Sequence, residues 1–233
     1  PVAHVEAGLR TDNIYSPFPE EINRRITSSI ATMHFAPTED SKQNLLREGH
    51  KADSIFVTGN TVIDNLLNIS KKLDNQSKED ELAISERIGA RLSNRKIILV
   101  TGHRRENFGD GLENICRALR IVAERNNVQI IFSVHLNPNV QKQVNNLLSD
   151  IVNIDLVPPI DYEAFIYLMK KTYLVITDSG GIQEEVPSLK VPVLVTRDTT
   201  ERPEGVRAGT SKLIGIDQEF IIKSVEEILN DKD

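Results

Sequence analysis

The chain has 233 residues, 28 of them basic and 34 acidic, for a net charge of −6, with one cysteine and no tryptophan. The acidic balance excludes a nucleic-acid platform, whose electrostatic footprint is basic, and a single cysteine excludes an internal disulfide framework. No run of about 18 apolar residues occurs, so no transmembrane segment is predicted, and we expect a cytoplasmic protein that binds neither membrane nor nucleic acid.

Apolar, β-branched runs alternate with helical patterns along the chain. The predicted strands span residues 2–7, 33–37, 55–58, 96–101, 128–134, 154–157, 173–177 and 191–196. The predicted helices span residues 19–31, 41–48, 62–73, 82–92, 110–124, 139–148, 162–170, 181–189 and 220–229. Alternation of this kind, with continuously apolar strands, predicts parallel sheets covered on both faces, so the expected fold class is α/β.

A polar, weakly patterned stretch at residues 74–80 suggests a junction between two domains. We expect residues 1–60 to be the remainder of a first Rossmann-like domain, 61–95 a helical junction, and 96–233 a second Rossmann-like domain. The final helix of the second domain is a candidate for packing back across the junction. Because Pro1 opens a strand-like run without a methionine, we expect the N-terminal part of the protein to be missing from this chain.

The segment with the strongest chemical signal is a buried strand that runs into Ser179, Gly180 and Gly181 and then into a helix. Two glycines let the backbone approach a ligand closely, and the free amides of a helix start favour an anion. Glu184 and Glu185 follow in the first turns, where a carboxylate can accept hydrogen bonds from sugar hydroxyls. The pattern predicts a nucleotide site; a plain connector with acids that stabilise the helix dipole is the alternative.

A second candidate segment, residues 101–107, follows a predicted strand and contains His103, Arg104 and Arg105. Open α/β sheets bind ligands at the carboxyl ends of their strands, and this group suits a diphosphate by charge and by hydrogen bonding. The alternative is a solvated charge cluster on a loop. His135 also ends a predicted strand and could bind a phosphate or a second ligand, although a structural histidine is the commoner outcome.

Two acids near the start of the chain are candidates for proton transfer. Glu6 ends the first predicted strand, and Glu20 lies in a proline-rich turn before a helix. Two carboxylates across a cleft suit stepwise acid/base chemistry, although each acid taken singly is more often a cap or a surface charge. The polar loop at residues 197–204 could close such a cleft. No metal-ligand spacing and no Gly-x-Ser-x-Gly elbow occurs, so we expect no metal site, no cofactor and no serine hydrolase.

These segments together resemble the bacterial non-hydrolysing UDP-N-acetylglucosamine 2-epimerases. The resemblance runs in the family's order over nearly the whole chain, and it is carried by residues 4–11, 19–24, 57–64, 102–107, 135–138, 178–185 and 197–204. It implies two Rossmann-like domains of the glycosyltransferase-B type, the first one truncated here, with the active site between them.

The resemblance also implies an activity and roles for individual residues. The family interconverts UDP-N-acetylglucosamine and UDP-N-acetylmannosamine for surface-polysaccharide synthesis, by eliminating UDP to a 2-acetamidoglucal and adding it back. By motif, the catalytic residues are Glu6, Glu20 and His103. The residues implied to bind substrate are Arg24 near the diphosphate, Phe165 against the uracil, and Ser179, Gly180 and Glu185 at the UDP site, with Glu185 on the ribose. Arg104 and His135 match an allosteric site for a second UDP-N-acetylglucosamine in some members.

The chain departs from the family pattern at its start. Further strand–helix units, a phosphate loop and another catalytic aspartate would lie before Pro1, roughly 100 residues by domain size. We therefore expect an isomerase that is dimeric at full length, whereas this chain alone is weak or inactive.

Three other functions stay open at this point. A glycosyltransferase of the same fold would bind UDP but consume the sugar nucleotide, since a fold does not determine a function. A hydrolysing 2-epimerase would release free N-acetylmannosamine and UDP. A catalytically inert UDP-sugar-binding protein would not need Glu6, Glu20 and His103 together.

Overall fold

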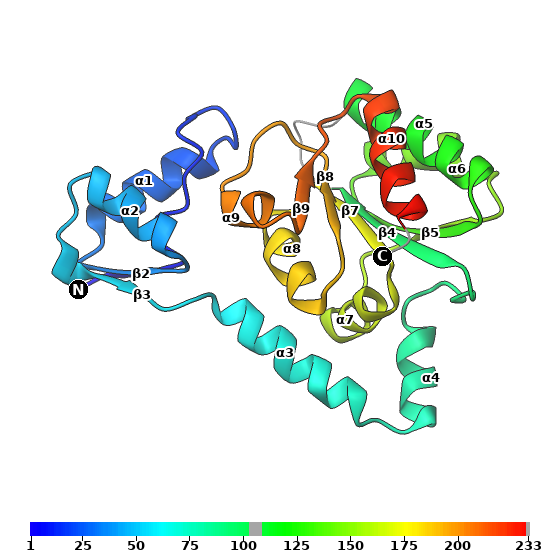
Figure 1. The fold of residues 1–233 in the computed structure, drawn as a ribbon, viewed down its shortest axis with the longest axis horizontal. Coiled ribbons are helices and arrows are strands. Elements are labelled where there is room, and N and C mark those ends of the chain that lie inside the picture. Colours follow the sequence, from blue (N-terminus) through cyan, green and yellow to red (C-terminus); the bar gives the residue numbers. More distant parts are fainter. Residues whose placement is uncertain (103–108, 232–233) are drawn as a thin grey trace. The chain divides into compact units, whose positions relative to one another are not determined.

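The computed structural model describes residues 1–102 and 109–231 of the chain. They form two compact units: Pro1–Asn65 with Thr199–Arg202, and Leu66–Asp198 with Pro203–Asp233 (Figure 1). His103 and Arg104, which the sequence nominates for the site, lie outside the described residues. Within the described ranges, none of the helices combines the length and the apolar composition that a membrane span needs.

The first unit is built on a small parallel sheet. Its strands lie in the order β1 (Ala3–Val5), β2 (Met33–Ala36) and β3 (Ile55–Val57). The helices of this unit are α1 (Glu20–Ile30), α2 (Glu39–Arg47) and the single 3₁₀ turn η1 (Ala52–Ser54). Thr38 starts α2 by accepting a hydrogen bond from the Ser41 amide at 3.1 Å, as an N-cap does.

One face of this first sheet is covered and the other is open. The strand register places Ala3, Val5, Met33, Phe35 and Phe56 on the same face, because paired residues of neighbouring strands point to one side. Val5 is 63% exposed and Phe56 45% exposed, so this apolar face is largely uncovered by the described residues. The opposite face packs into a small core of Ala7, Ala36, Leu45 and Ile55.

Histidines lie on the covered face of the same sheet. The ring of His34, which is buried, lies 4.5 Å from the ring of His50 between centroids. Beside them Arg10 is buried and holds Glu48 through two hydrogen bonds of 2.7 and 2.8 Å. Burial, then the neighbouring His50 and Arg10, lower the pKa of His34, while the hydrogen bond from Arg10 lowers the pKa of Glu48. A compact set of polar groups is therefore packed behind the strand that leads to Glu6.

The second unit contains a six-stranded parallel sheet in the order β6-β5-β4-β7-β8-β9. The strands are β4 (Lys96–Gly102), β5 (Val128–Val134), β6 (Ile154–Val157), β7 (Leu174–Thr177), β8 (Val193–Val195) and β9 (Ser211–Leu213). Counted from β4, this is the order 3-2-1-4-5-6 of a Rossmann fold. The α/β class with Rossmann-like sheets that the sequence predicts is therefore confirmed.

Helices cover both faces of this larger sheet. They are α3 (Thr61–Asp74, which begins in the first unit), α4 (Lys78–Glu86), α5 (Asp110–Arg125), α6 (Pro138–Leu148), α7 (Tyr162–Lys171), α8 (Gly180–Glu185), η3 (Val186–Leu189), α9 (Pro203–Arg207) and α10 (Gln218–Asn230).

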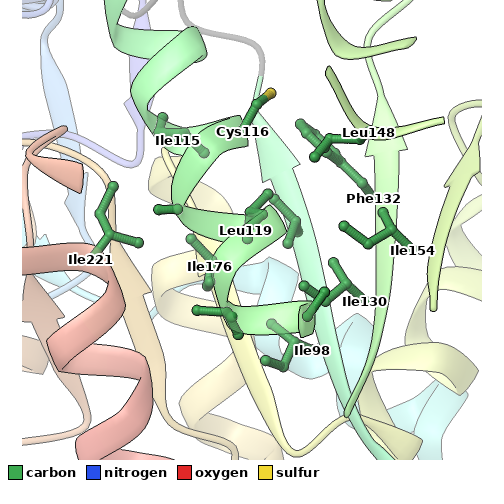
Figure 2. Close-up of a cluster of buried hydrophobic side chains, with 14 of the residues drawn as sticks. Ile98, Ile115, Cys116, Leu119, Ile130, Phe132, Leu148, Ile154, Ile176 and Ile221 are labelled. Carbon is green, nitrogen blue, oxygen red and sulfur yellow. The ribbon is translucent and has the colours of Figure 1, made fainter. Parts of the chain in front are cut away.

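Alternate residues of each strand enter different cores. In β4, Ile98 and Val100 pack with α5, α6 and α10, a cluster that Figure 2 shows around Leu119, Phe132 and Ile221. Ile97 and Leu99 of the same strand pack into the other cluster, with α3 and α7. Burial on both faces explains why these strands read as continuous apolar runs.

Some predicted boundaries differ from the structure. The helix predicted at 82–92 is α4, which begins at Lys78 because Ser77 and Asp80 form a capping box. The helix predicted at 181–189 is divided into α8 and the 3₁₀ turn η3, which contains Pro187. The short elements η1, α9 and β9 were not predicted.

Candidate functional site

Glu6 lies where β1 ends, and its backbone is left-handed, with φ of 61°. A non-glycine residue in this region costs about 1–3 kcal/mol and is concentrated at functional sites. The conformation is imposed by a buried turn that runs from Ala7 to Arg10. In that turn Gly8 has φ of 88°, and a Cβ atom there would lie 2.1 Å from the Ser41 carbonyl oxygen. The close approach to α2 therefore fixes the turn, and the turn fixes Glu6.

The Glu6 carboxylate is held by two side chains that the sequence places far away. Its Oε1 accepts hydrogen bonds from Arg202 Nη2 at 2.9 Å and from Asn60 Nδ2 at 3.3 Å. The Arg202 side chain is 9% exposed and the Glu6 side chain 41% exposed. A buried guanidinium thus secures a carboxylate that still reaches solvent, which is the situation a group needs in order to exchange protons with a ligand.

A second acid joins two arginines next to Glu6. Glu201 Oε1 accepts a hydrogen bond from Arg202 Nη1 at 2.8 Å and lies 3.5 Å from Arg24 Nη2. Arg24 is on α1, and its Nη1 is buried without a hydrogen-bond partner among the described residues. An unsatisfied buried guanidinium N–H is costly, and an anionic ligand is the natural partner for it. Glu6, Arg24, Glu201 and Arg202 therefore form one network of alternating charge.

Glu20 differs from its neighbour in the first turn of α1. Glu21 is fully buried and accepts hydrogen bonds from the backbone amides of Thr11 and Asp12, at 3.1 and 3.2 Å. Glu20 is exposed and makes no hydrogen bond or ion pair with any described residue. Glu21 therefore has a structural role, whereas Glu20 stays available for the catalytic role that the sequence predicts.

In the second unit, the topological switch point lies between β4 and β7. Ligands of such sheets bind outside the carboxyl ends of the strands at this point. The two strand ends are joined there by Thr101 Oγ1 and Thr177 Oγ1, which lie 2.7 Å apart, and Thr177 Oγ1 also accepts a hydrogen bond from the Ser179 amide at 3.0 Å. This arrangement sets the start of α8, where Ser179 and Gly180 were predicted to bind UDP.

Glu185 ends α8 and is 6% exposed. Burial raises the pKa of its carboxyl group, and a hydrogen bond of 2.6 Å from the Tyr162 hydroxyl opposes that shift. Phe165 lies almost one turn after Tyr162 on α7 and packs, partly buried, against the hydrophobic cluster there. The structure therefore brings Tyr162 to Glu185, a contact that sequence reasoning missed.

His135 follows β5 and is exposed. Its Nδ1 accepts a hydrogen bond from the Asn137 amide at 3.1 Å, just before α6. A neutral imidazole that accepts at Nδ1 carries its proton at Nε2, which can then donate to a ligand. Of the two residues matched to an allosteric site, His135 lies within the described residues and Arg104 does not. No group of His, Cys, Asp or Glu in the described ranges is arranged to hold a metal ion.

Besides Tyr162, sequence reasoning gave no individual role to Asn60, Glu201 and Arg202. The loop 197–204 had been noted as polar, but nothing in the pattern pairs Arg202 with Glu6. The available signal was the resemblance, whose segments 57–64 and 197–204 already contain these three residues.

Comparison with known proteins shows the family to which the chain belongs. Residues 1–233 match the family model described as UDP-N-acetylglucosamine 2-epimerase. The UDP-N-acetylglucosamine 2-epimerase of Salmonella typhimurium is 54% identical over 100% of this chain and 62% of its own length, and that of Campylobacter jejuni is 53% identical over 100% and 61%.

A solved structure is similar to this chain in both sequence and fold. The crystal structure of UDP-GlcNAc 2-epimerase from Neisseria meningitidis bound to UDP-GlcNAc matches with a TM-score of 0.93 and 49% identity, over 98% of this chain and 62% of that one. The chain spans about 62% of the length of the curated relatives it matches. The chain belongs to the UDP-N-acetylglucosamine 2-epimerase family.

Proposed function

We propose that the protein carrying this chain interconverts UDP-N-acetylglucosamine and UDP-N-acetylmannosamine without hydrolysis. One observation carries the proposal beyond family membership. The Glu6 carboxylate stands on a strained strand end, paired with Arg202, in a network that also contains the unsatisfied guanidinium of Arg24. A proton acceptor beside guanidinium groups suits the removal of a carbon-bound proton with departure of a diphosphate.

The elimination step follows from these groups. A base takes the C2 proton, the C2–H electron pair forms the C1–C2 double bond, and the C1–O bond breaks so that its electrons leave with UDP. The guanidiniums of Arg24 and Arg202 stabilise the negative charge that develops on the departing diphosphate. Return of a proton to the opposite face of C2, with UDP added back at C1, gives the epimer. Glu6 and Glu20 provide two carboxylates for these transfers, and His103 is the third catalytic residue by motif.

The nucleotide half of the substrate is assigned to the second unit. The Ser179 amide donates to Thr177 Oγ1, whereas the Gly180 amide begins α8 and has no partner within that helix. This Gly180 amide and the Ser179 hydroxyl support the assignment of both residues to the diphosphate. The buried carboxylate of Glu185 suits the ribose hydroxyls, and Phe165 the uracil. The Neisseria meningitidis relative was crystallised with UDP-GlcNAc, which supports the same ligand for this protein.

The proposal has three further parts. A homodimer and an allosteric UDP-N-acetylglucosamine that contacts Arg104 and His135 come from the resemblance. The division of the chain at residues 60 and 95 comes from the polar, weakly patterned stretch between them. The exposed His135 ring, with its Nε2 proton directed by the Asn137 contact, supports the allosteric site.

The test is to incubate the intact protein that carries this chain with UDP-N-acetylglucosamine in deuterated water and to follow C2 by NMR. We expect UDP-N-acetylmannosamine with deuterium at C2. Free N-acetylmannosamine with UDP would move the protein to the hydrolysing class. Sugar transfer to an acceptor would identify a glycosyltransferase, and binding without exchange would leave a UDP-sugar-binding protein.

A further inference from the structure

The Glu185 carboxylate is buried, and among the described residues its hydrogen-bond partner is the neutral hydroxyl of Tyr162. Its Oε1 accepts the 2.6 Å hydrogen bond from Tyr162, and its Oε2 forms no hydrogen bond with any residue in the described parts of the chain. Burial raises the pKa of Glu185, the hydrogen bond from Tyr162 lowers it, and the preceding Glu184 adds to the rise. The hydrogen bond from Tyr162 therefore sets the orientation of the carboxylate and favours its charged form.

Tyr162 is itself well anchored. It is the first residue of α7, which Asp161 caps by accepting a hydrogen bond from the Ala164 amide at 3.2 Å. Its ring packs, partly buried, against the hydrophobic cluster of Leu99 and Val175. A tyrosine has only two side-chain torsions, so an anchored ring delivers its hydroxyl to one place.

We propose that Tyr162 is a positioning residue for nucleotide recognition. It occupies Oε1 of Glu185 and thereby leaves Oε2 as the acceptor for the vicinal hydroxyls of a nucleoside ribose, so that preference for ribose over a deoxygenated sugar depends on this pair. This inference rests on the proposed function, which assigns Glu185 to the ribose. The inference adds Tyr162 as the residue that makes Glu185 selective for the two neighbouring hydroxyls of ribose.

The same helix offers a matched control. Tyr167 donates a hydrogen bond of 2.9 Å to Glu81 Oε1, which Lys171 also contacts at 3.0 Å. This pair has the same chemistry and its tyrosine lies on the same helix, but the side chain of Glu81, on α4, is 45% exposed and already has a cation as partner. Loss of the Tyr167 hydroxyl should therefore leave nucleotide recognition unchanged.

The experiment measures the affinity of the intact protein for UDP and for 2′,3′-dideoxyuridine diphosphate, which lacks both ribose hydroxyls, by calorimetry. Wild type should prefer UDP. Tyr162→Phe should reduce that preference about tenfold, the value of one hydrogen bond to a charged group, while the affinity for the dideoxy nucleotide is unchanged. Tyr167→Phe should keep the wild-type preference.

Three results would overturn the inference. The Tyr162→Phe variant could keep the wild-type preference for UDP, or it could lose affinity for both nucleotides equally. The wild-type protein could also bind the two nucleotides with the same affinity. A wild type that binds neither nucleotide would overturn the proposed UDP site itself. If Tyr162→Phe fails to fold, Glu185→Gln decides, since it replaces an acceptor by a donor: preserved preference for UDP in that variant would contradict the role of the pair.

Discussion

The two sheets of this chain are built from the same parallel strands but are completed differently. In the second unit β4 sends Ile98 to one hydrophobic cluster and Leu99 to the other, so both faces are buried within the unit. In the first unit one face packs on α2, while Val5 and Phe56 on the other face are largely exposed. The second unit therefore has a two-sided core of its own. Within this chain the first unit is held by fixed turns and buried polar contacts, and these also hold Glu6.

The largest effect is expected for Gly8→Ala in the first unit. The new Cβ would lie 2.1 Å from the Ser41 carbonyl oxygen at a φ of 88°, so the turn after β1 cannot persist. We expect a loss of more than about 4 kcal/mol in the opening free energy of this unit, together with loss of epimerase activity. Hydrogen exchange with mass spectrometry on peptides from each unit measures this.

Gly49→Ala is the control for that substitution. Gly49 has a similar φ of 87°, but nothing lies within 4 Å of its Cβ position. It should cost only the conformational strain, about 1 kcal/mol. Equal effects of the two variants would show that close packing against α2 does not determine the turn.

Leu119→Ala tests the second unit. Leu119 is fully buried in the cluster between α5 and the sheet, so its truncation should lower stability by about 3 kcal/mol. Peptides of the second unit should exchange faster, while those of the first keep their protection. Leu82→Ala, at a position 62% exposed on α4, should change stability by less than about 0.5 kcal/mol. Loss of protection in both units after Leu119→Ala would mean that they unfold together.

Arg202→Lys tests the network that the first unit places around Glu6. Arg202 contacts Glu6 and Glu201 through two different nitrogens, at 2.9 and 2.8 Å, and an ammonium group cannot bridge in this way. We expect kcat to fall about tenfold or more, because a misplaced group costs rate. The first unit should also lose about 1–3 kcal/mol of stability, because one buried hydrogen bond is left unmade. Arg95→Lys, at an exposed site, is the control. Wild-type kcat in Arg202→Lys would remove Arg202 from the mechanism.

The smallest effect is a pH dependence of the first unit. Burial lowers the pKa of His34 in the folded chain below its ordinary value of 6.5. At a pH between the folded-state pKa and 6.5, the unfolded chain therefore binds more protons than the folded one. Stability from this group is complete above about pH 6.5 and is lost as the pH falls below it. Urea titrations at pH 7.5 and 5.5, each followed by pulse labelling at one common pH, should show a lower midpoint at pH 5.5 for the first unit.

His34→Phe should weaken that dependence, whereas His135→Phe, at an exposed site, should leave it intact. A first unit equally stable at both pH values would contradict the assigned cause.

The sequence predicted the second sheet better than the rest for a physical reason. Burial on both faces makes β4 and β5 continuous apolar runs, which are visible without any tertiary information. By contrast β9, with Ser211 and Lys212, has no such signal, and α4 was placed too late because Ser77 and Asp80 were read as a polar linker.

The candidate site also has residues that the sequence predicts and contacts that it does not. Glu6, Ser179 and Glu185 could be nominated because each follows or ends an element with a recognisable pattern. The contacts of Arg202 with Glu6, and of Tyr162 with Glu185, join positions 196 and 23 residues apart, and only the folded backbone brings them together.

The most direct test is hydrogen–deuterium exchange at C2 of UDP-N-acetylglucosamine by the Glu6→Gln variant of the intact protein in deuterated water. Glutamine keeps the size of the side chain and can still accept from Arg202, but it cannot take a proton. We predict that deuterium incorporation falls by about 10²-fold or more, while UDP still binds. Incorporation at the wild-type rate would contradict the role of Glu6.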